Sequence, residues 1–258
     1  MSFIVVIPAR YASTRFPGKP LIDIGGKPMV VRVAERAALS SATRVVVATD
    51  DEAINAACVR EGIAVAMTRS DHPTGTDRLA EVVNQLALDD DAIVVNVQGD
   101  EPLIPASAIE LVAALLVGKP DAAIATLCHP IHEAADAINP NVVKCVIDEA
   151  GLALYFSRAP IPYARDAWSQ GVVTLPPKLP LFRHIGLYAY RASFLRTFPA
   201  LTVPAIERFE CLEQLRALAH GYRIAVGVVT DPLPPGVDTP EDYQRLLVRY
   251  SAAANLTL

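Results

Sequence analysis

The sequence of 258 residues contains little cysteine, and this argues against two common kinds of scaffold. The four cysteines are far apart and form no C-x-x-C pair, so neither a disulfide framework nor a zinc site is indicated. We expect reduced thiols, most of them in the core, at Cys58, Cys128, Cys145 and Cys211.

Long apolar runs are also missing. No run approaches the roughly 18 residues that a membrane-spanning helix needs, and the first residues carry no basic region of the kind that opens a secretory signal. We therefore expect a cytoplasmic protein that has no membrane partner.

Basic residues are outnumbered by acidic ones. The chain has 23 Lys and Arg against 28 Asp and Glu, which gives a formal net charge of −5. Because a nucleic-acid surface needs a basic face, we expect a small-molecule partner and no nucleic acid. Hydrophobic residues make up 52% of the sequence, enough for the core of one large domain.

The positive charge that is present gathers near the beginning of the chain. Residues 8–21, P-A-R-Y-A-S-T-R-F-P-G-K-P-L, follow an apolar strand at 3–7 and include no acidic side chain. Three prolines stiffen this loop, and Gly18 lets the backbone approach a ligand. Neither common glycine-rich phosphate motif occurs. The loop predicts a site for an anion such as a triphosphate, with a solvated basic loop as the alternative; its basic residues are Arg10, Arg15 and Lys19.

Apolar runs of strand length alternate with segments of helical period over the first half of the chain. This pattern predicts an α/β fold with a Rossmann-like, mainly parallel sheet and helices on both faces. Residues 139–191 are instead expected to form a small inserted antiparallel subdomain within a single domain of residues 1–258. The predicted strands are 3–7, 45–48, 63–67, 92–97, 122–127, 142–147, 152–157, 185–190 and 224–230, and the predicted helices are 29–39, 52–61, 79–88, 105–117, 192–198, 208–220 and one beginning near 239.

Two aspartates stand where such sheets bind ligands, at the carboxyl ends of strands. Asp100 lies just after the strand 92–97, in the turn Q-G-D, and Asp238 follows the strand 224–230. Mg²⁺ takes oxygen ligands from one or two carboxylates together with substrate phosphates, so both residues are candidate metal ligands. The alternatives are a turn carboxylate at Asp100 and a helix cap at Asp238.

Two further segments carry polar groups suited to a ligand. In T-G-T-D-R, Thr76 and Asp77 offer hydroxyl and carboxylate groups, and the guanidinium of Arg78 fits a carboxylate or phosphate. In H-I-G-L-Y-A-Y-R, His184 and Tyr188 share one face of a strand. The alternatives are an ordinary helix cap and an ordinary amphipathic strand.

Covalent acyl chemistry has no support in the sequence. No Ser/His/Asp spacing and no G-x-S-x-G elbow occurs, and no general base is obvious. This favours metal-assisted nucleotidyl transfer, in which positioning and charge neutralisation do most of the catalysis.

Six segments follow one another in the order P-A-R-Y-A-S-T-R-F-P-G-K-P-L, H-P-T-G-T-D-R, N-V-Q-G-D-E-P, H-I-G-L-Y-A-Y-R, E-x-L-E-Q-L-R and G-V-D-T-P-E-D. In these segments the chain resembles the 3-deoxy-manno-octulosonate (Kdo) cytidylyltransferases, or CMP-Kdo synthetases, over essentially its full length. The resemblance implies the nucleotide-diphospho-sugar transferase fold and a Mg²⁺-dependent reaction of CTP with Kdo that gives CMP-Kdo and pyrophosphate for lipopolysaccharide biosynthesis. It also implies a homodimer with the added strands at the subunit contact. Pro73 departs from the Ser that family members tend to have there.

The resemblance further assigns roles to matching residues. Either Arg78 or Arg158 is expected to meet the sugar carboxylate, while the anomeric hydroxyl attacks the α-phosphate in line. The residues implied for CTP are Ala9, Arg10, Ser13, Lys19, Thr76, Asp77 and Gln98; those for Kdo are Arg15, Arg78, Arg158, His184, Tyr188, Glu213 and Gln214; those for catalysis are Arg10, Lys19, Asp100 and Asp238, the last two holding Mg²⁺.

Two other functions remain open. One is a transferase of the same fold that uses another acid sugar, such as sialic acid, or another nucleoside triphosphate. The second is a noncatalytic nucleotide-binding protein built on a similar sheet. The presence of Asp100 and Asp238 after two different strands favours the enzyme.

Overall fold

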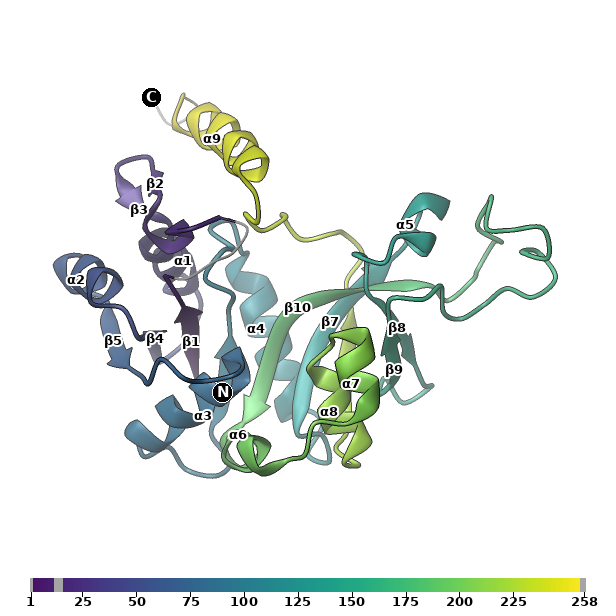
Figure 1. Cartoon of the computed structure of the whole chain (residues 1–258), viewed down its shortest axis with the longest axis horizontal. Coiled ribbons are helices and arrows are strands. Elements are labelled where there is room, and N and C mark those ends of the chain that lie inside the picture. Colours follow the sequence, from purple (N-terminus) through teal and green to yellow (C-terminus); the bar gives the residue numbers. More distant parts are fainter. Residues whose placement is uncertain (1, 12–15, 256–258) are drawn as a thin grey trace.

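The computed structural model describes residues 2–11 and 16–255, and within them one mixed sheet runs through the molecule (Figure 1). Its strands are β1 (Phe3–Ala9), β4 (Arg44–Thr49), β5 (Ala64–Met67), β6 (Ile93–Asn96), β7 (Ile124–Pro130), β8 (Lys144–Ile147), β9 (Ala153–Ser157), β10 (Phe182–Arg191) and β11 (Ile224–Val228). The main path has the order β11-β7-β10-β6-β1-β4-β5, and β8 and β9 branch from β10. A small hairpin of β2 (Asp23–Ile24) and β3 (Lys27–Pro28) stands apart.

Helices cover both faces of this sheet, so the predicted α/β class is confirmed. The helices are α1 (Met29–Ala37), α2 (Glu52–Arg60), α3 (Gly75–Gln85), α4 (Ala106–Val117), α5 (Ala134–Ile138), α6 (Ala192–Thr197), α7 (Ala205–Glu210), α8 (Gln214–Ala219) and α9 (Pro240–Asn255), with short 3-10 turns at Lys19–Leu21 and Phe198–Ala200. Among the described helices, none combines the length and apolar content that a membrane crossing needs.

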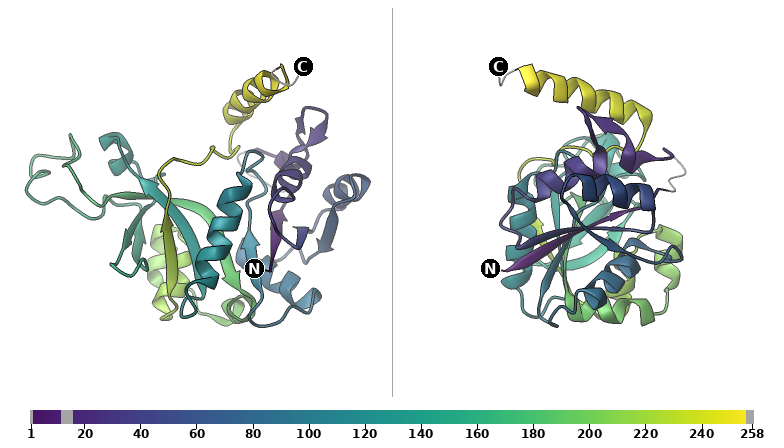
Figure 2. Two further views of the ribbon diagram at one scale, coloured as in Figure 1. Left: turned by 180° about the vertical axis from the view of Figure 1, so that it is seen from behind. Right: turned by 90° about the vertical axis from the view of Figure 1, so that its left-hand side faces the viewer.

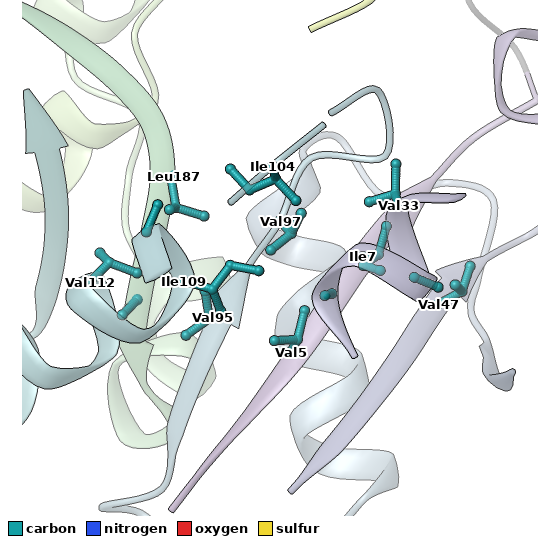
Figure 3. Close-up of a cluster of buried hydrophobic side chains, with 14 of the residues drawn as sticks. Val5, Ile7, Val33, Val47, Val95, Val97, Ile104, Ile109, Val112 and Leu187 are labelled. Carbon is teal, nitrogen blue, oxygen red and sulfur yellow. The ribbon is translucent and has the colours of Figure 1, made fainter. Parts of the chain in front are cut away.

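The central strand β1 explains why two layers of helices form. It pairs in parallel with β4 and β6, so both of its edges are occupied. Its side chains alternate between the two cores: Val5 and Ile7 pack on the side of α1, α2 and α4, whereas Val6 packs on the side of α3, α6 and α8. Figure 3 shows the first of these cores, where Val5 and Ile7 meet Val33 of α1 and Ile109 of α4. A strand buried on both faces reads as a continuous apolar run, as F-I-V-V-I does.

Strand β10 is the exception to the parallel order. It lies between β6 and β7 and runs antiparallel to both, with Tyr188 opposite Asn96 on one side and Thr126 on the other. Residues 185–190 are antiparallel, as the sequence predicts. They belong, however, to the centre of the main sheet, and only Phe182 and Arg183 at the start of β10 pair with β8. The wider subdomain boundary of 139–191 stays a prediction.

A smaller core lies beneath the added segment. Trp168 is 1% exposed and packs with Ile131, Val142 and Leu181. Its indole Nε1 donates to the carbonyl of Thr174 at 2.9 Å, which satisfies the one polar atom of the ring. The proline-rich stretch is therefore folded around the chain's single tryptophan.

Two predicted helices differ from those observed. Helix α3 begins at Gly75 rather than at 79, because Thr74 caps it by accepting the backbone N–H of Asp77 at 3.2 Å. The single helix predicted at 208–220 is wrong. The chain breaks at Cys211, whose φ of 50° ends α7 in the left-handed region. The sequence did not reveal this break because apolar residues recur every third position across it, as they would on one helix: Phe209, Leu212, Leu215 and Leu218.

The C-terminal segment returns to the carboxyl end of β1 and β6. After β11, the chain runs along that edge to α9, which lies near the β2–β3 hairpin (Figures 1 and 2). The hydroxyl of Tyr243 donates to the carbonyl of Asp23 at 2.6 Å, and Arg32 stacks on the ring of Tyr250 at 5.3 Å. This return places residues 236–238 beside the turn that follows β6.

Candidate active site

A lysine and two aspartates from three distant segments meet at the carboxyl end of the sheet. Lys19 Nζ lies 2.6 Å from Asp100 Oδ2 and 3.2 Å from Asp238 Oδ1. The lysine side chain is 13% exposed, so the contacts are partly shielded from water. The basic loop and both candidate metal ligands therefore share one site.

Close backbone packing holds this cluster together. A Cβ on Gly99 would lie 2.8 Å from the carbonyl oxygen of Pro8, which is too close for any other residue. Val237 N donates to the carbonyl of Asp100 at 2.8 Å and so ties the C-terminal segment to the turn. Thr239 and Asp242, not Asp238, cap α9 through hydrogen bonds between them. The side chain of Asp238 is thereby turned toward Lys19.

Arg10 connects the basic loop to the start of α3. Its Nη2 donates to the carbonyls of His72 and Thr74 at 2.8 and 3.0 Å. Ala9 is buried at the end of β1, next to Gly99. Of the other residues implied for this region, Ser13 and Arg15 lie outside the described residues.

A pocket of about 250 Å³ opens on the face of the sheet covered by α3 and α8. Five residues of the predicted nucleotide and sugar sets line it together. The lining consists of Gly75, Thr76, Asn96, Gln98, Ile124, Tyr188, Tyr190, Phe198, Glu213, Gln214 and Ala217. Gln98 is two residues from Asp100, so the Q-G-D turn joins the pocket to the lysine and aspartate cluster.

The polar groups of the pocket are held in defined states. Burial raises the pKa of Glu213, while the hydroxyl of Thr76 donates to its carboxylate and acts in the opposite direction. Burial also raises the pKa of Tyr188 and Tyr190, so both phenols stay neutral and can donate. The buried amide nitrogen Nε2 of Gln214 finds no hydrogen-bond partner among the described residues. These donors and acceptors suit a ligand rich in hydroxyl groups.

His184 lies beside this pocket. Its ring packs 5.0 Å from that of Phe156 and 5.3 Å from that of Tyr188, and Nε2 is 3.0 Å from the hydroxyl of Thr126. Burial lowers the pKa of His184 to about 3, so the ring is neutral at physiological pH. His184 is not among the residues that line this pocket; it lines a second cavity of about 360 Å³ together with Glu101 and Arg183.

The two arginines expected to meet a sugar carboxylate have other partners. Arg78 is fully buried, donates to Thr68 Oγ1 and forms an ion pair with Asp50 at 3.2 Å. Burial lowers its pKa, and the nearby charge of Arg10 lowers it further while Asp50 raises it. Arg158 donates to the carbonyls of Pro140 and Glu210 at 2.7 and 2.6 Å. Neither lines the pocket, and their role toward the sugar stays a prediction.

Asp77 also serves the protein locally. Its Oδ2 accepts from the hydroxyl of Thr74 at 2.6 Å, in the first turn of α3.

Sequence reasoning did not assign Asn96 or Tyr190 to the pocket, nor did it pair Asp50 with Arg78. A polar Asn inside the apolar run V-V-N-V was the available signal for the first of these, because a buried amide needs partners.

Divalent metal binding can be judged from the donors present. Among the described residues no group of three or more His, Cys, Asp or Glu side chains is arranged to hold a metal. Asp100 and Asp238 both reach one ammonium, which shows that their oxygens can share one cation. Next to them, burial and the charge of Asp100 raise the pKa of Glu101 to about 8. Two carboxylates plus ligand phosphates match the coordination that Mg²⁺ prefers.

The comparisons with known proteins agree with this geometry. Residues 4–224 match the cytidylyltransferase family. The chain therefore belongs to the cytidylyltransferases. A solved CMP:2-keto-3-deoxy-manno-octonic acid synthetase, complexed with CTP, is 42% identical with a TM-score of 0.88, over 98% of this chain and 99% of that one. A cytidylyltransferase from Leptospira borgpetersenii serovar Hardjo-bovis (strain JB197) shares the fold at 17% identity and a TM-score of 0.61, over 97% of this chain and 87% of that one.

Proposed function

We propose that the protein transfers the CMP group of CTP to Kdo, giving CMP-Kdo and pyrophosphate for lipopolysaccharide biosynthesis. The observation that carries this proposal is the junction at Gln98–Asp100, where a pocket lined by polar groups adjoins the cluster of Lys19, Asp100 and Asp238. A sugar and a polyphosphate can then be held side by side. The 42% identity to a synthetase complexed with CTP supports the same assignment.

The charge of each side chain determines which part of the substrates it would bind. Arg10 and Lys19 supply positive groups for the phosphates, Thr76 and Gln98 supply hydrogen bonds to CTP, and Tyr188 and Glu213 supply hydrogen bonds to the sugar. The anomeric hydroxyl of Kdo loses its proton to solvent as its oxygen forms a bond to the α-phosphorus, and the bond between that phosphorus and the bridging oxygen breaks to release pyrophosphate. Asp100 and Asp238 would hold Mg²⁺, which neutralises charge on the phosphate oxygens when bound.

Glu213 is suited to orient the attacking sugar. Its carboxyl is buried in the pocket and hydrogen-bonded by Thr76, so it has a fixed position. A carboxylate held in this way can accept a hydrogen bond from a sugar hydroxyl. Glu213 therefore suits a substrate that carries hydroxyl groups.

We propose that the protein works as a homodimer. Three apolar residues spaced along the α7 segment face solvent in the single chain: Val203 and Ile206 are 42% and 39% exposed and Phe209 is 90% exposed. Within the described residues strand β9 pairs with β8, and Leu152 just before it bridges Ala225 of β11; Leu154 of β9 is 60% exposed. An open strand edge beside exposed apolar side chains suits a second copy of the same surface.

The protein is proposed to act in the cytoplasm. Cys58, Cys128 and Cys145 are buried and Cys211 is exposed, all as free thiols. Free thiols are typical of proteins that work in a reducing compartment.

A coupled pyrophosphate assay tests the reaction. The protein is incubated with each of the four ribonucleoside triphosphates and either Kdo or sialic acid, with and without Mg²⁺. We expect release only with CTP, Kdo and Mg²⁺. Faster release with UTP, or release with sialic acid and not Kdo, would assign another transferase of this fold, and CTP binding without turnover would make the protein a noncatalytic binder.

A further inference from the structure

Two pocket residues depend on an unusual corner of the backbone. Glu213 and Gln214 follow Cys211, which joins α7 to α8 with φ 50° and ψ 49°. This left-handed conformation is unfavourable for a residue with a Cβ and persists only when its surroundings hold it. Some contact between the two helices must therefore maintain the corner.

A buried ion pair spans the corner. Arg216 of α8 donates to Glu207 of α7 through Nε at 2.8 Å and Nη2 at 2.6 Å, a bidentate arrangement. The two residues are 4% and 8% exposed, and the Arg216 guanidinium also stacks on the ring of Phe198 at 4.3 Å. The hydrogen bonds to Glu207 raise the pKa of Arg216, so it stays charged. A paired fork of this kind fixes both distance and angle between its elements.

We propose that Glu207 and Arg216 are positioning residues that fix Glu213 and Gln214 in the sugar pocket. Arg216 lies two residues after Gln214, and Glu207 lies on the other side of the left-handed corner. The pair therefore fixes the segment 208–215 at both ends. The ring of Phe198 is part of the pocket wall, so the same guanidinium also supports the side chain that the ligand contacts.

A second set of bonds anchors α7 and the corner residue to the sheet. Glu210 accepts from Ser157 Oγ at 2.5 Å and from Arg158 N at 2.9 Å. Arg158 Nη2 also donates to the carbonyl of Cys211 at 3.4 Å, so these bonds hold α7 and reach as far as the corner. Helix α8 packs on the sheet through its buried Leu215 and Ala217, and the fork of Arg216 sets its angle to α7.

The inference rests on the proposed function, and steady-state kinetics with CTP and Kdo test it. Arg216→Lys keeps the charge but loses the fork. We expect it to raise KM for Kdo at least about tenfold, because small displacements of binding groups are costly. KM for CTP should stay within about twofold. Equal changes in both KM values, or none, would overturn the inference.

A double variant separates positioning from folding. Breaking one partner of a buried pair leaves an uncompensated charge, whereas replacing both by apolar residues of similar volume is often neutral for stability. Glu207→Leu with Arg216→Met should therefore keep the wild-type Tm while KM for Kdo rises. Arg223→Met is the matched control, since its pairing with Asp121 is exposed and 3.7 Å long; it should leave both KM values unchanged.

Failure of the proposed function has a different signature. If the wild-type protein uses another acid sugar, the reaction assignment falls, and the same KM comparison on that sugar tests the ion pair. If no sugar supports turnover, a crystal structure of the double variant shows whether the ion pair positions Glu213 and Gln214. We expect Glu213 to leave the hydroxyl of Thr76; an unmoved Glu213 and Gln214 would contradict the inference.

Discussion

Lys19 and Asp100 are 81 positions apart in the chain, yet their side chains meet at 2.6 Å. One comes from a stiff loop after β1 and the other from the turn after β6, and these strands are parallel neighbours. Parallel neighbours place their carboxyl ends at the same edge of a sheet. The contact therefore follows from the sheet order, and it gathers one positive and two negative groups where a polyphosphate and its counter-ion would bind.

The aspartate of this pair is expected to be essential for turnover. Asp100→Asn keeps the shape of the side chain but removes the charge that Lys19 and a metal ion would share. We expect the rate of pyrophosphate release to fall at least about 100-fold, as electrostatic groups at transferring phosphates often contribute this much. The measurement is the pyrophosphate assay with CTP and Kdo at saturating Mg²⁺.

Removal of the metal ion tests the same site by a second measurement of pyrophosphate release. EDTA should abolish release in the wild-type protein, and added Mg²⁺ should restore it. Far-UV circular dichroism controls for folding in the variant. A folded Asp100→Asn protein with an unchanged rate would remove Asp100 from the catalytic residues.

The turn before Asp100 has no room for a larger residue. Gly99→Ala would place a Cβ 2.8 Å from the carbonyl oxygen of Pro8, so either β1 or the turn must shift. We expect a loss of about 1–3 kcal/mol in the free energy of unfolding, the usual cost of overpacking, together with lower activity. Urea unfolding measures the first effect. Gly118→Ala, with its nearest atom at 3.5 Å, is the control and should cost less.

Stability should fall toward acid pH because of His184. Its pKa is about 3 in the folded protein and near 6.5 when unfolded. Below about pH 6.5 the unfolded state takes up a proton that the folded state does not, so the free energy of unfolding falls as the pH drops toward 3. His184→Gln, which is neutral throughout, should lose about 2 kcal/mol less than the wild type between pH 7 and pH 5. Identical losses in urea melts at the two pH values would contradict the shift.

The subunit contact is expected to depend on Phe209. A two-fold interface buries the residue from both copies, and truncating an aromatic anchor costs about 2 kcal/mol per copy. Phe209→Ser should therefore raise the dimer Kd by about 10³. Sedimentation equilibrium measures this directly. Leu39→Ser, at a residue 66% exposed just after α1, should leave the mass of the dimer unchanged; a dimer that survives Phe209→Ser would place the contact elsewhere.

Much of the fold could be predicted from local patterns. The apolar run at β1 and the alternation of strands and helices determine a sheet covered on both faces, since each of those strands must bury both sides. The position of β10 between β6 and β7, and its antiparallel direction, could not be predicted from local patterns. A strand buried between two others has the same apolar pattern whether it runs parallel or antiparallel, so H-I-G-L-Y-A-Y-R did not reveal its neighbours.

The site was predictable where a residue type and its position both restrict the chemistry. Lys19, Asp100 and Asp238 follow strands or stiff loops, and the structure brings them together. Arg78 shows the limit, because a guanidinium suited to a carboxylate ligand is equally suited to a carboxylate of the protein, and Asp50 provides one. Arg158 likewise donates to backbone carbonyls that no sequence pattern marks.

The central position of β10 also constrains the order in which the chain can fold. Its pairing of Tyr188 with Asn96 joins residues 92 positions apart, so β6 lacks one neighbour until residue 191 has left the ribosome. Contacts of such long sequence separation form late and slow the overall rate. The strands β1, β4, β5 and β6, although synthesised first, therefore have a complete sheet around them only after β10 has formed.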